Sequence, residues 1–207
     1  TLAPGSTLDD TDLPEGALTL NAGGVTAGAF VVTGGTGDDV LNTGSGSDTI
    51  NAGAGNDTIN AGEGNNVISV GSGNNLVNTG GGNDTITNES GNNTVNSGGG
   101  ADSITLSDGN NVVNSGTGND SVTLGNGNNV VDLGSGNDTL VAGNGNNVVT
   151  GGAGRDTITT GTGNDYITGG ADGDTIVLGG GEDSIRYVQA TESFGLAGAR
   201  DTVVGFG

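Results

Sequence analysis

Aspartate is the residue whose spacing in this chain most suggests chemistry. Between Asp39 and Asp183 one side chain recurs every nine residues, eleven times as aspartate and six times as asparagine. If each repeat forms a turn, stacked turns bring these carboxylates together, and close carboxylates repel one another unless a cation lies between them. Paired carboxylates can also hydrolyse glycosides, but side chains that recur at every turn offer no unique pocket. The pattern therefore predicts cation binding rather than catalysis.

The composition excludes several other functions. The 207-residue chain has 24 Asp and Glu but only three arginines and no lysine, and its formal charge of −21 repels the phosphates of nucleic acids. Histidine and cysteine are absent, which excludes Ser-His-Asp and Cys-His catalysis, structural zinc and disulfide bonds. No apolar run is long enough to cross a bilayer. We therefore expect no catalytic residues and no enzyme activity, no nucleic-acid partner and no membrane span.

The spacing of the aspartates belongs to a longer repeat. Residues 34–186 divide into 17 consecutive nonapeptides without insertion or deletion, for example Ala52–Asn60, which reads AGAGNDTIN. Position eight is Ile, Val or Leu in all 17 repeats, position four is Gly in 16, position two is Gly in 15, and position six is the Asp or Asn. Glycine permits the positive φ angles of a tight turn. The last three residues suit a short strand whose middle side chain faces inward.

Alternating strand and turn every nine residues gives two strands and two turns in each 18-residue coil. We therefore predict an all-β fold, a right-handed parallel β-roll or β-solenoid with two short parallel sheets and one aliphatic row in each. Residues 34–186 form the roll. Residues 1–33 are expected to lead into it with cap strands near 17–20 and 29–32, and residues 187–207 to form a C-terminal cap or the start of a following segment.

The consensus Gly-Gly-x-Gly-x-Asp-x-aliphatic-x resembles the calcium-binding nonapeptide repeats of RTX (repeats-in-toxin) proteins, which occur in bacterial surface-layer proteins, adhesins and type I secreted exoproteins. The resemblance covers about three quarters of the chain. In that family each calcium ion lies between two turns on the same side of the roll, held by position-six carboxylates and backbone carbonyls. Oxygen ligands on flexible loops suit this hard cation. The resemblance thus implies that Ca²⁺ is the cation.

Because repeats two apart stack, the position-six residues of even-numbered and odd-numbered repeats form two separate edges. On the family's geometry we expect a continuous calcium ladder on the even edge from Asp84 to Asp174, and calcium on the odd edge only at its two ends, about seven ions in all. The expected metal ligands are Asp39, Asp57, Asp84, Asp102, Asp120, Asp138, Asp156, Asp165, Asp174 and Asp183. Asp172 replaces a turn glycine, which makes the site between Asp156 and Asp174 the least regular.

The odd edge between its ends is expected to be an amide ladder without metal, from Asn75 to Asn147. The alternative is that Asn and Asp are interchangeable turn formers and that both edges bind calcium.

The outward positions of the two predicted sheets also differ. On the even sheet they are rich in Thr and Ser, which resembles the Thr-x-Thr faces of solenoid ice-binding proteins, although Thr is a common strand residue. On the odd sheet position seven supplies an apolar row that includes Leu76, Val112, Val130 and Val148. This row could contact a neighbouring segment or chain, or reflect strand propensity alone.

These features favour a calcium-binding structural module of a secreted bacterial surface protein, of the surface-layer or adhesin type, that folds on binding extracellular calcium. Extracellular or cell-surface localisation and type I secretion are implied by the family resemblance. The alternatives are the C-terminal repeat region of a type I secreted exoenzyme or toxin, and an ice-binding adhesin segment that uses the Thr/Ser face.

Overall fold

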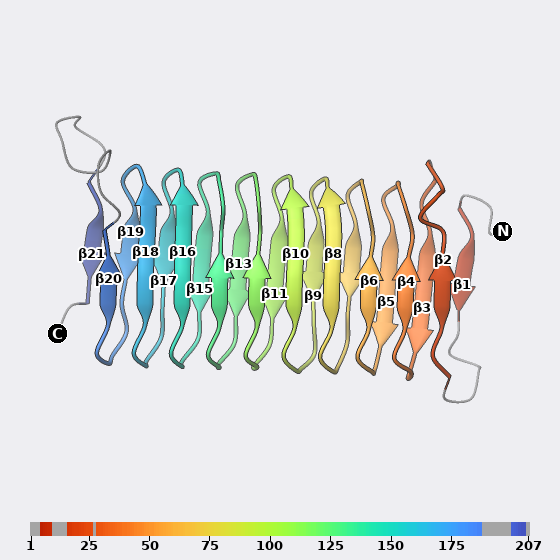
Figure 1. The fold of residues 1–207 in the computed structure, drawn as a ribbon, viewed down its shortest axis with the longest axis horizontal. Helices are drawn as coiled ribbons and strands as arrows, with labels where there is room; N and C mark the ends of the chain where they lie inside the picture. Colours follow the sequence, from red (N-terminus) through yellow and green to blue (C-terminus); the bar gives the residue numbers. More distant parts are fainter. Residues whose placement is uncertain (1–4, 10–15, 27, 188–199, 206–207) are drawn as a thin grey trace.

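The structure is a computed structural model that describes residues 5–9, 16–26, 28–187 and 200–205. The chain winds into a flat solenoid in which two parallel sheets lie face to face (Figure 1). Each strand pairs with the strand one coil later, so that Ile104 of one strand aligns with Val122 of the next. This confirms the all-β fold with two parallel sheets and coils of 18 residues. At about 4.8 Å per coil, the eleven strands of one sheet extend the rod over roughly 50 Å.

The strands alternate between the sheets in chain order. The eleven-stranded sheet contains β1 (Thr7–Asp9), β3 (Val31–Gly35), β5 (Thr49–Gly53), β7 (Val67–Ser69), β9 (Thr85–Thr87), β11 (Ser103–Leu106), β13 (Ser121–Leu124), β15 (Thr139–Ala142), β17 (Thr157–Thr159), β19 (Thr175–Val177) and β21 (Thr202–Val204). The ten-stranded sheet contains β2 (Thr19–Asn21), β4 (Val40–Asn42), β6 (Thr58–Asn60), β8 (Leu76–Gly81), β10 (Thr94–Gly99), β12 (Val112–Asn114), β14 (Val130–Asp132), β16 (Val148–Ala153), β18 (Tyr166–Ala171) and β20 (Ser184–Arg186).

The strands outside the repeats continue the same stacking. β1 pairs with β3, and β2 pairs with β4, so the described part of the N-terminal segment forms additional coils. The strands expected near 17–20 and 29–32 are observed at Thr19–Asn21 and Val31–Gly35. At the other end β21 pairs with β19 and extends the eleven-stranded sheet. In the described residues no helix is long and apolar enough to cross a membrane.

The interior holds more than the one aliphatic row per sheet that was predicted. Within a repeat such as the one containing Asp102, Ile104 and Leu106, alternate side chains point inward, and all three are at most 2% exposed. The period of two explains this pattern, because positions six and eight and the first position of the next repeat lie on the same side of an extended chain. The position-six side chains are therefore inside the roll.

Candidate metal centre

The position-six side chains form two continuous ladders along the edges of the roll. The backbone N–H of Asp84 donates to Oδ1 of Asp102 at 2.8 Å, that of Asp102 to Oδ1 of Asp120 at 2.9 Å, and that of Asp120 to Oδ1 of Asp138 at 2.7 Å. The turn leaves this N–H without a strand partner, so the side chain of the next coil accepts its hydrogen bond. Each side chain is thereby fixed through one oxygen.

The ladder on the even edge lies in the turns that lead into the eleven-stranded sheet. It begins where Phe30 donates its N–H to Asp48, passes through Asn66, and continues along the aspartates from Asp84. The ladder on the odd edge lies in the turns that lead into the ten-stranded sheet. It runs from Leu18 to Asp183 through aspartates at both ends and asparagines between them.

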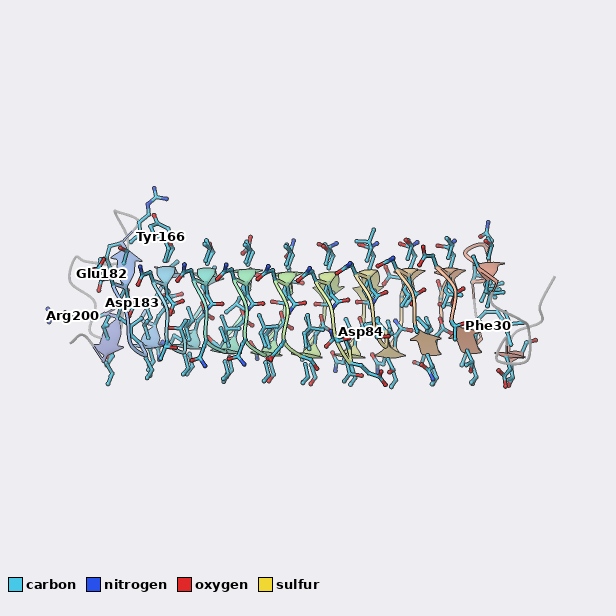
Figure 2. The ribbon with its side chains drawn as sticks, turned by 90° about the horizontal axis from the view of Figure 1, so that it is seen from below. Phe30, Asp84, Tyr166, Glu182, Asp183 and Arg200 are labelled. Carbon is cyan, nitrogen blue, oxygen red and sulfur yellow. The ribbon has the colours of Figure 1, made fainter. Side chains whose placement is uncertain are left out.

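The second carboxylate oxygen is buried and lacks a hydrogen-bond partner in many of these turns. Among the described residues, Oδ2 accepts no hydrogen bond in Asp48, Asp57, Asp84, Asp102, Asp120, Asp138, Asp156 and Asp165. All eight side chains are at most 2% exposed, and Figure 2 shows Asp84 between the two sheets. A buried carboxylate oxygen without a partner carries a large desolvation cost. Each such oxygen is therefore a candidate ligand for a cation.

The hydroxyl groups nearest to three of these carboxylates are already engaged. Thr79, Ser97 and Ser115 each occupy position one of the repeat that supplies the aspartate. Their hydroxyl protons are donated to backbone carbonyls of the next coil, at 2.6, 2.9 and 2.8 Å. A hydroxyl group has one proton, so these residues do not satisfy Oδ2.

The asparagines reveal which groups face the second side-chain atom. Nδ2 of Asn66 donates to the carbonyl of Gly64 at 2.9 Å and to that of Gly62 at 3.4 Å, and it lies 3.0 Å from Oδ1 of Asp84. Asp and Asn have the same shape and the same Oδ1 anchor in this ladder, so Oδ2 of an aspartate faces the equivalent carbonyls of positions two and four. The aspartate turns thus present a cluster made only of oxygen atoms.

Burial changes the protonation of these carboxyl groups. Desolvation raises the pKa of Asp57 from 3.8 to about 6, with a further rise from the nearby Asp39 and Asp38 charges and an opposing effect of the backbone N–H bond from Asp39. Desolvation also raises the pKa values of Asp84, Asp102, Asp120, Asp138 and Asp156. The ionised form is disfavoured unless positive charge is supplied.

These oxygen atoms fit a calcium ion. In the described part of the chain no group of three or more acidic side chains converges to hold a metal, so a cation here needs backbone carbonyls in addition to the carboxylates. A mixture of carboxylate and carbonyl oxygens on glycine-rich loops is the donor set that Ca²⁺ prefers. The residues that would hold it on the even edge are Asp84, Asp102, Asp120, Asp138, Asp156 and Asp174, together with carbonyls of positions two and four.

The structure places the ten predicted ligands in the two ladders, buried in every case except Asp183, which is partly buried. Occupancy by calcium at each of them stays a prediction. Two ladder residues were absent from the predicted set. Asp48 has the same buried, unpartnered Oδ2 as the others. Asp201 accepts the N–H of Asp174 at 3.0 Å, across 27 residues instead of 18.

A sequence signal for Asp201 exists. Residues 200–204 read RDTVV, which matches positions five to nine of a repeat such as RDTIT at residues 155–159. The match is displaced by nine residues from the uninterrupted phase, so counting consecutive repeats does not find it.

A family model described as RTX calcium-binding nonapeptide repeat (4 copies) matches the chain at residues 33–68, 52–86, 60–95, 87–122, 105–140, 123–158 and 150–185. Together these matches span residues 33–185, 153 of the 207. No curated protein and no solved structure gave a significant match.

Proposed function

Because the chain belongs to the family of RTX calcium-binding nonapeptide repeats, we propose that it is the calcium-dependent structural module of a secreted bacterial surface protein, of the surface-layer or adhesin type. In this proposal the module stays unfolded where calcium is scarce and folds into a rod outside the cell. The single observation that carries the proposal is the row of buried Oδ2 atoms without a hydrogen-bond partner.

The energetics of these buried oxygens supports coupling between calcium and folding. Ionised aspartates that stack 18 residues apart destabilise the folded chain, because each is desolvated and faces another carboxylate. The unfolded chain leaves the same groups in water. A cation that binds only the folded form adds its binding free energy to stability. About seven Ca²⁺ ions would change the formal charge from −21 to about −7.

The residues of the chain would each contribute a defined part to this response. The Oδ1 hydrogen bond between coils orients each carboxylate, as in Asp102 to Asp120. The glycines of positions two and four bring backbone carbonyls to the same side of the turn. The aliphatic rows between the ladders, all of them buried, exclude water from the interior. When bound, calcium would supply the positive charge that these oxygens lack.

We propose that this part of the protein has no enzyme activity. Its carboxylates recur in near-identical surroundings at every coil, which favours ligation over catalysis. The alternative, the repeat region of a type I secreted exoenzyme or toxin, has the same calcium chemistry and differs only in what the rest of the protein does. A cell-surface location is supported by the family, because such repeats are typical of secreted bacterial proteins.

The Thr/Ser face supports a second candidate, an ice-binding adhesin segment. Position seven supplies Thr85, Ser103 and Ser121 in register on adjacent strands, and position nine supplies Thr87, Thr105 and Thr123. All six are exposed. Two parallel files of hydroxyl groups at a regular spacing could order water. Thermal hysteresis in the calcium-loaded protein would support this role, and its absence would leave the structural role alone.

We also propose that the apolar row of the ten-stranded sheet contacts a second copy of the chain. Val112, Val130 and Val148 align on adjacent strands and are 44–47% exposed. Leu76, 38% exposed, lies in the same row, which Tyr166 extends as it points outward in Figure 2. Sedimentation of the calcium-loaded protein tests this: Val130→Thr should weaken self-association, and a monomeric wild type at high concentration would refute it.

Far-UV circular dichroism during a calcium titration, with magnesium as the control, tests the main proposal. We expect a cooperative β signal to appear only with calcium, in the submillimolar to millimolar range of extracellular modules. A chain that is fully folded in chelator, or that responds equally to magnesium, would contradict calcium-gated folding.

A further inference from the structure

The asparagines at position six differ from the aspartates in one respect that the hydrogen bonds make visible. In the described residues the amide nitrogen of each of the six donates to a carbonyl of its own turn, whereas the corresponding Oδ2 of Asp84 or Asp120 has no partner. The six are Asn66, Asn75, Asn93, Asn111, Asn129 and Asn147.

The central odd edge shows the full pattern. Nδ2 of Asn129 lies 3.4 Å from the carbonyl oxygen of Gly125, 3.1 Å from that of Gly127, and 3.1 Å from Oδ1 of Asn147 in the next coil. Nδ2 of Asn111 makes the same three contacts, at 3.3, 3.2 and 3.3 Å. Two amide protons are thus shared among three oxygens that belong to two coils.

These three acceptors are the atoms that surround the unpartnered oxygen in an aspartate turn. Position two and position four supply the carbonyls in both cases, and the next coil supplies Oδ1. In an aspartate turn all the facing atoms are oxygens and the turn carries a negative charge. In an asparagine turn the amide supplies the positive partial charge, and its donors are satisfied without a metal.

We propose that the position-six asparagines are built-in substitutes for a bound cation, so that the identity of this one residue decides whether a turn takes calcium. The inference rests on the proposed function and deepens it. The odd edge from Asn75 to Asn147 is then a metal-free seam that holds one side of the rod closed, and calcium acts on the even edge and on the two ends of the odd edge.

The junctions between the two kinds of turn fit this assignment. Asn66 and Asn147 each precede an aspartate run, and the amide of each donates to the first carboxylate of that run, both at 3.0 Å. The amide therefore supplies positive partial charge to Oδ1 of Asp84 and of Asp165, where no preceding aspartate turn would provide a shared cation.

The test exchanges the two residue types in both directions and counts bound calcium by native mass spectrometry. The double variant Asn111→Asp/Asn129→Asp should bind at least one more ion than the wild type. The double variant Asp102→Asn/Asp120→Asn should bind at least two fewer. A matched control, Asn110→Asp/Asn128→Asp, adds the same charge at exposed positions one residue away and should bind no additional ion at saturating but submillimolar calcium.

A second measurement gives a sign that a merely structural role would not produce. In chelator at pH 7, Asp102→Asn/Asp120→Asn should retain more β signal than the wild type, although it binds less calcium. Variants that lose calcium and lose β signal in chelator would overturn the proposal, as would Asn→Asp variants with an unchanged ion count. If the wild type binds no calcium, the proposed function fails, and the chelator comparison still decides whether the amide replaces a positive charge.

Discussion

Nδ2 of Asn147 lies 3.0 Å from Oδ1 of Asp165, one coil further along the odd edge. The same nitrogen donates to the carbonyl oxygens of Gly143 and Gly145 at 3.2 and 3.0 Å. Asp165 occupies the equivalent place in its own coil, but its Oδ2 accepts no hydrogen bond from the described residues. Two side chains of the same shape, stacked one above the other, thus differ in whether the turn is electrically complete.

Replacing one aspartate of the even ladder should weaken calcium-dependent folding. Asp120→Ala removes a ligand from two adjacent sites, and the N–H of Asp102 loses its acceptor. We expect at least a ten-fold increase in the calcium concentration at the folding midpoint, as second-order effects on metal sites alone reach that size.

Asn129→Ala is the contrasting variant for Asp120→Ala. It also removes a buried hydrogen-bonding group, at a cost of about 1–3 kcal/mol of stability, but it should leave the calcium stoichiometry unchanged. Circular dichroism and native mass spectrometry on both variants check the pair. Equal losses of bound calcium would show that the two edges do not differ.

The response to pH should have opposite signs with and without calcium. The pKa of Asp57 is about 6 in the folded chain, above its ordinary value of 3.8, and burial raises the pKa values of the even-ladder aspartates from Asp84 to Asp156 as well. A raised folded-state pKa means that folding favours the protonated group. Its stabilising contribution is therefore complete below about pH 4 and is lost as the pH rises through about 6.

In chelator, acidification from pH 7 to pH 5 should accordingly increase the β signal. In calcium, the same protons compete with the ion, so the apparent calcium affinity should fall over the same range. Titrations at pH 5, 6 and 7 measure both effects. A chelated chain that loses structure on mild acidification would contradict the assignment of buried, charge-starved carboxylates.

The close stacking of the turns makes some glycines irreplaceable. Gly136 has a φ angle of 142°, and a Cβ atom placed there would collide with the carbonyl of Gly118 in the preceding coil. Gly136→Ala should lower stability by about 3 kcal/mol or more, combining backbone strain with overpacking. Gly180→Ala is the control, because its nearest new contact would be Thr162 Cγ2 at 3.8 Å. Thermal unfolding in calcium should separate the two variants clearly.

The C-terminal strand β21 should depend on Asp201. This side chain accepts the N–H of Asp174, and β21 then pairs with β19, where Leu178 donates its N–H to Val204. Asp201→Ala should speed hydrogen exchange at the amides of Asp174 and Leu178 by roughly ten-fold or more, as expected for the loss of one buried hydrogen bond. Thr202→Ala, which alters an exposed side chain of the same strand, should leave these rates unchanged.

Much of this architecture could be predicted from the sequence because the repeat has no insertion over 153 residues. The aliphatic residue at position eight, such as Ile104, fixes the strand and its inward face, and the glycines fix the turns. The 18-residue register follows, because only two nonapeptides close a coil.

The depth of position six could not be predicted in the same way. A turn residue such as Asp102 is expected near the surface, and only the observed continuation of the period of two through the turn shows that it is buried. Asp201 was missed because its ladder contact spans an extra nine residues. The amide contacts of Asn129 depend on which carbonyls the turn directs inward, which sequence spacing alone does not specify.

Locating the ions in a calcium-grown crystal by anomalous scattering tests the central claim most directly. We expect density beside the even-edge aspartates from Asp84 to Asp174 and at the two ends of the odd edge, with none beside Asn93, Asn111 or Asn129. Ions spaced evenly along both edges would contradict the account, because the asparagine turns would then need a metal as much as the aspartate turns do.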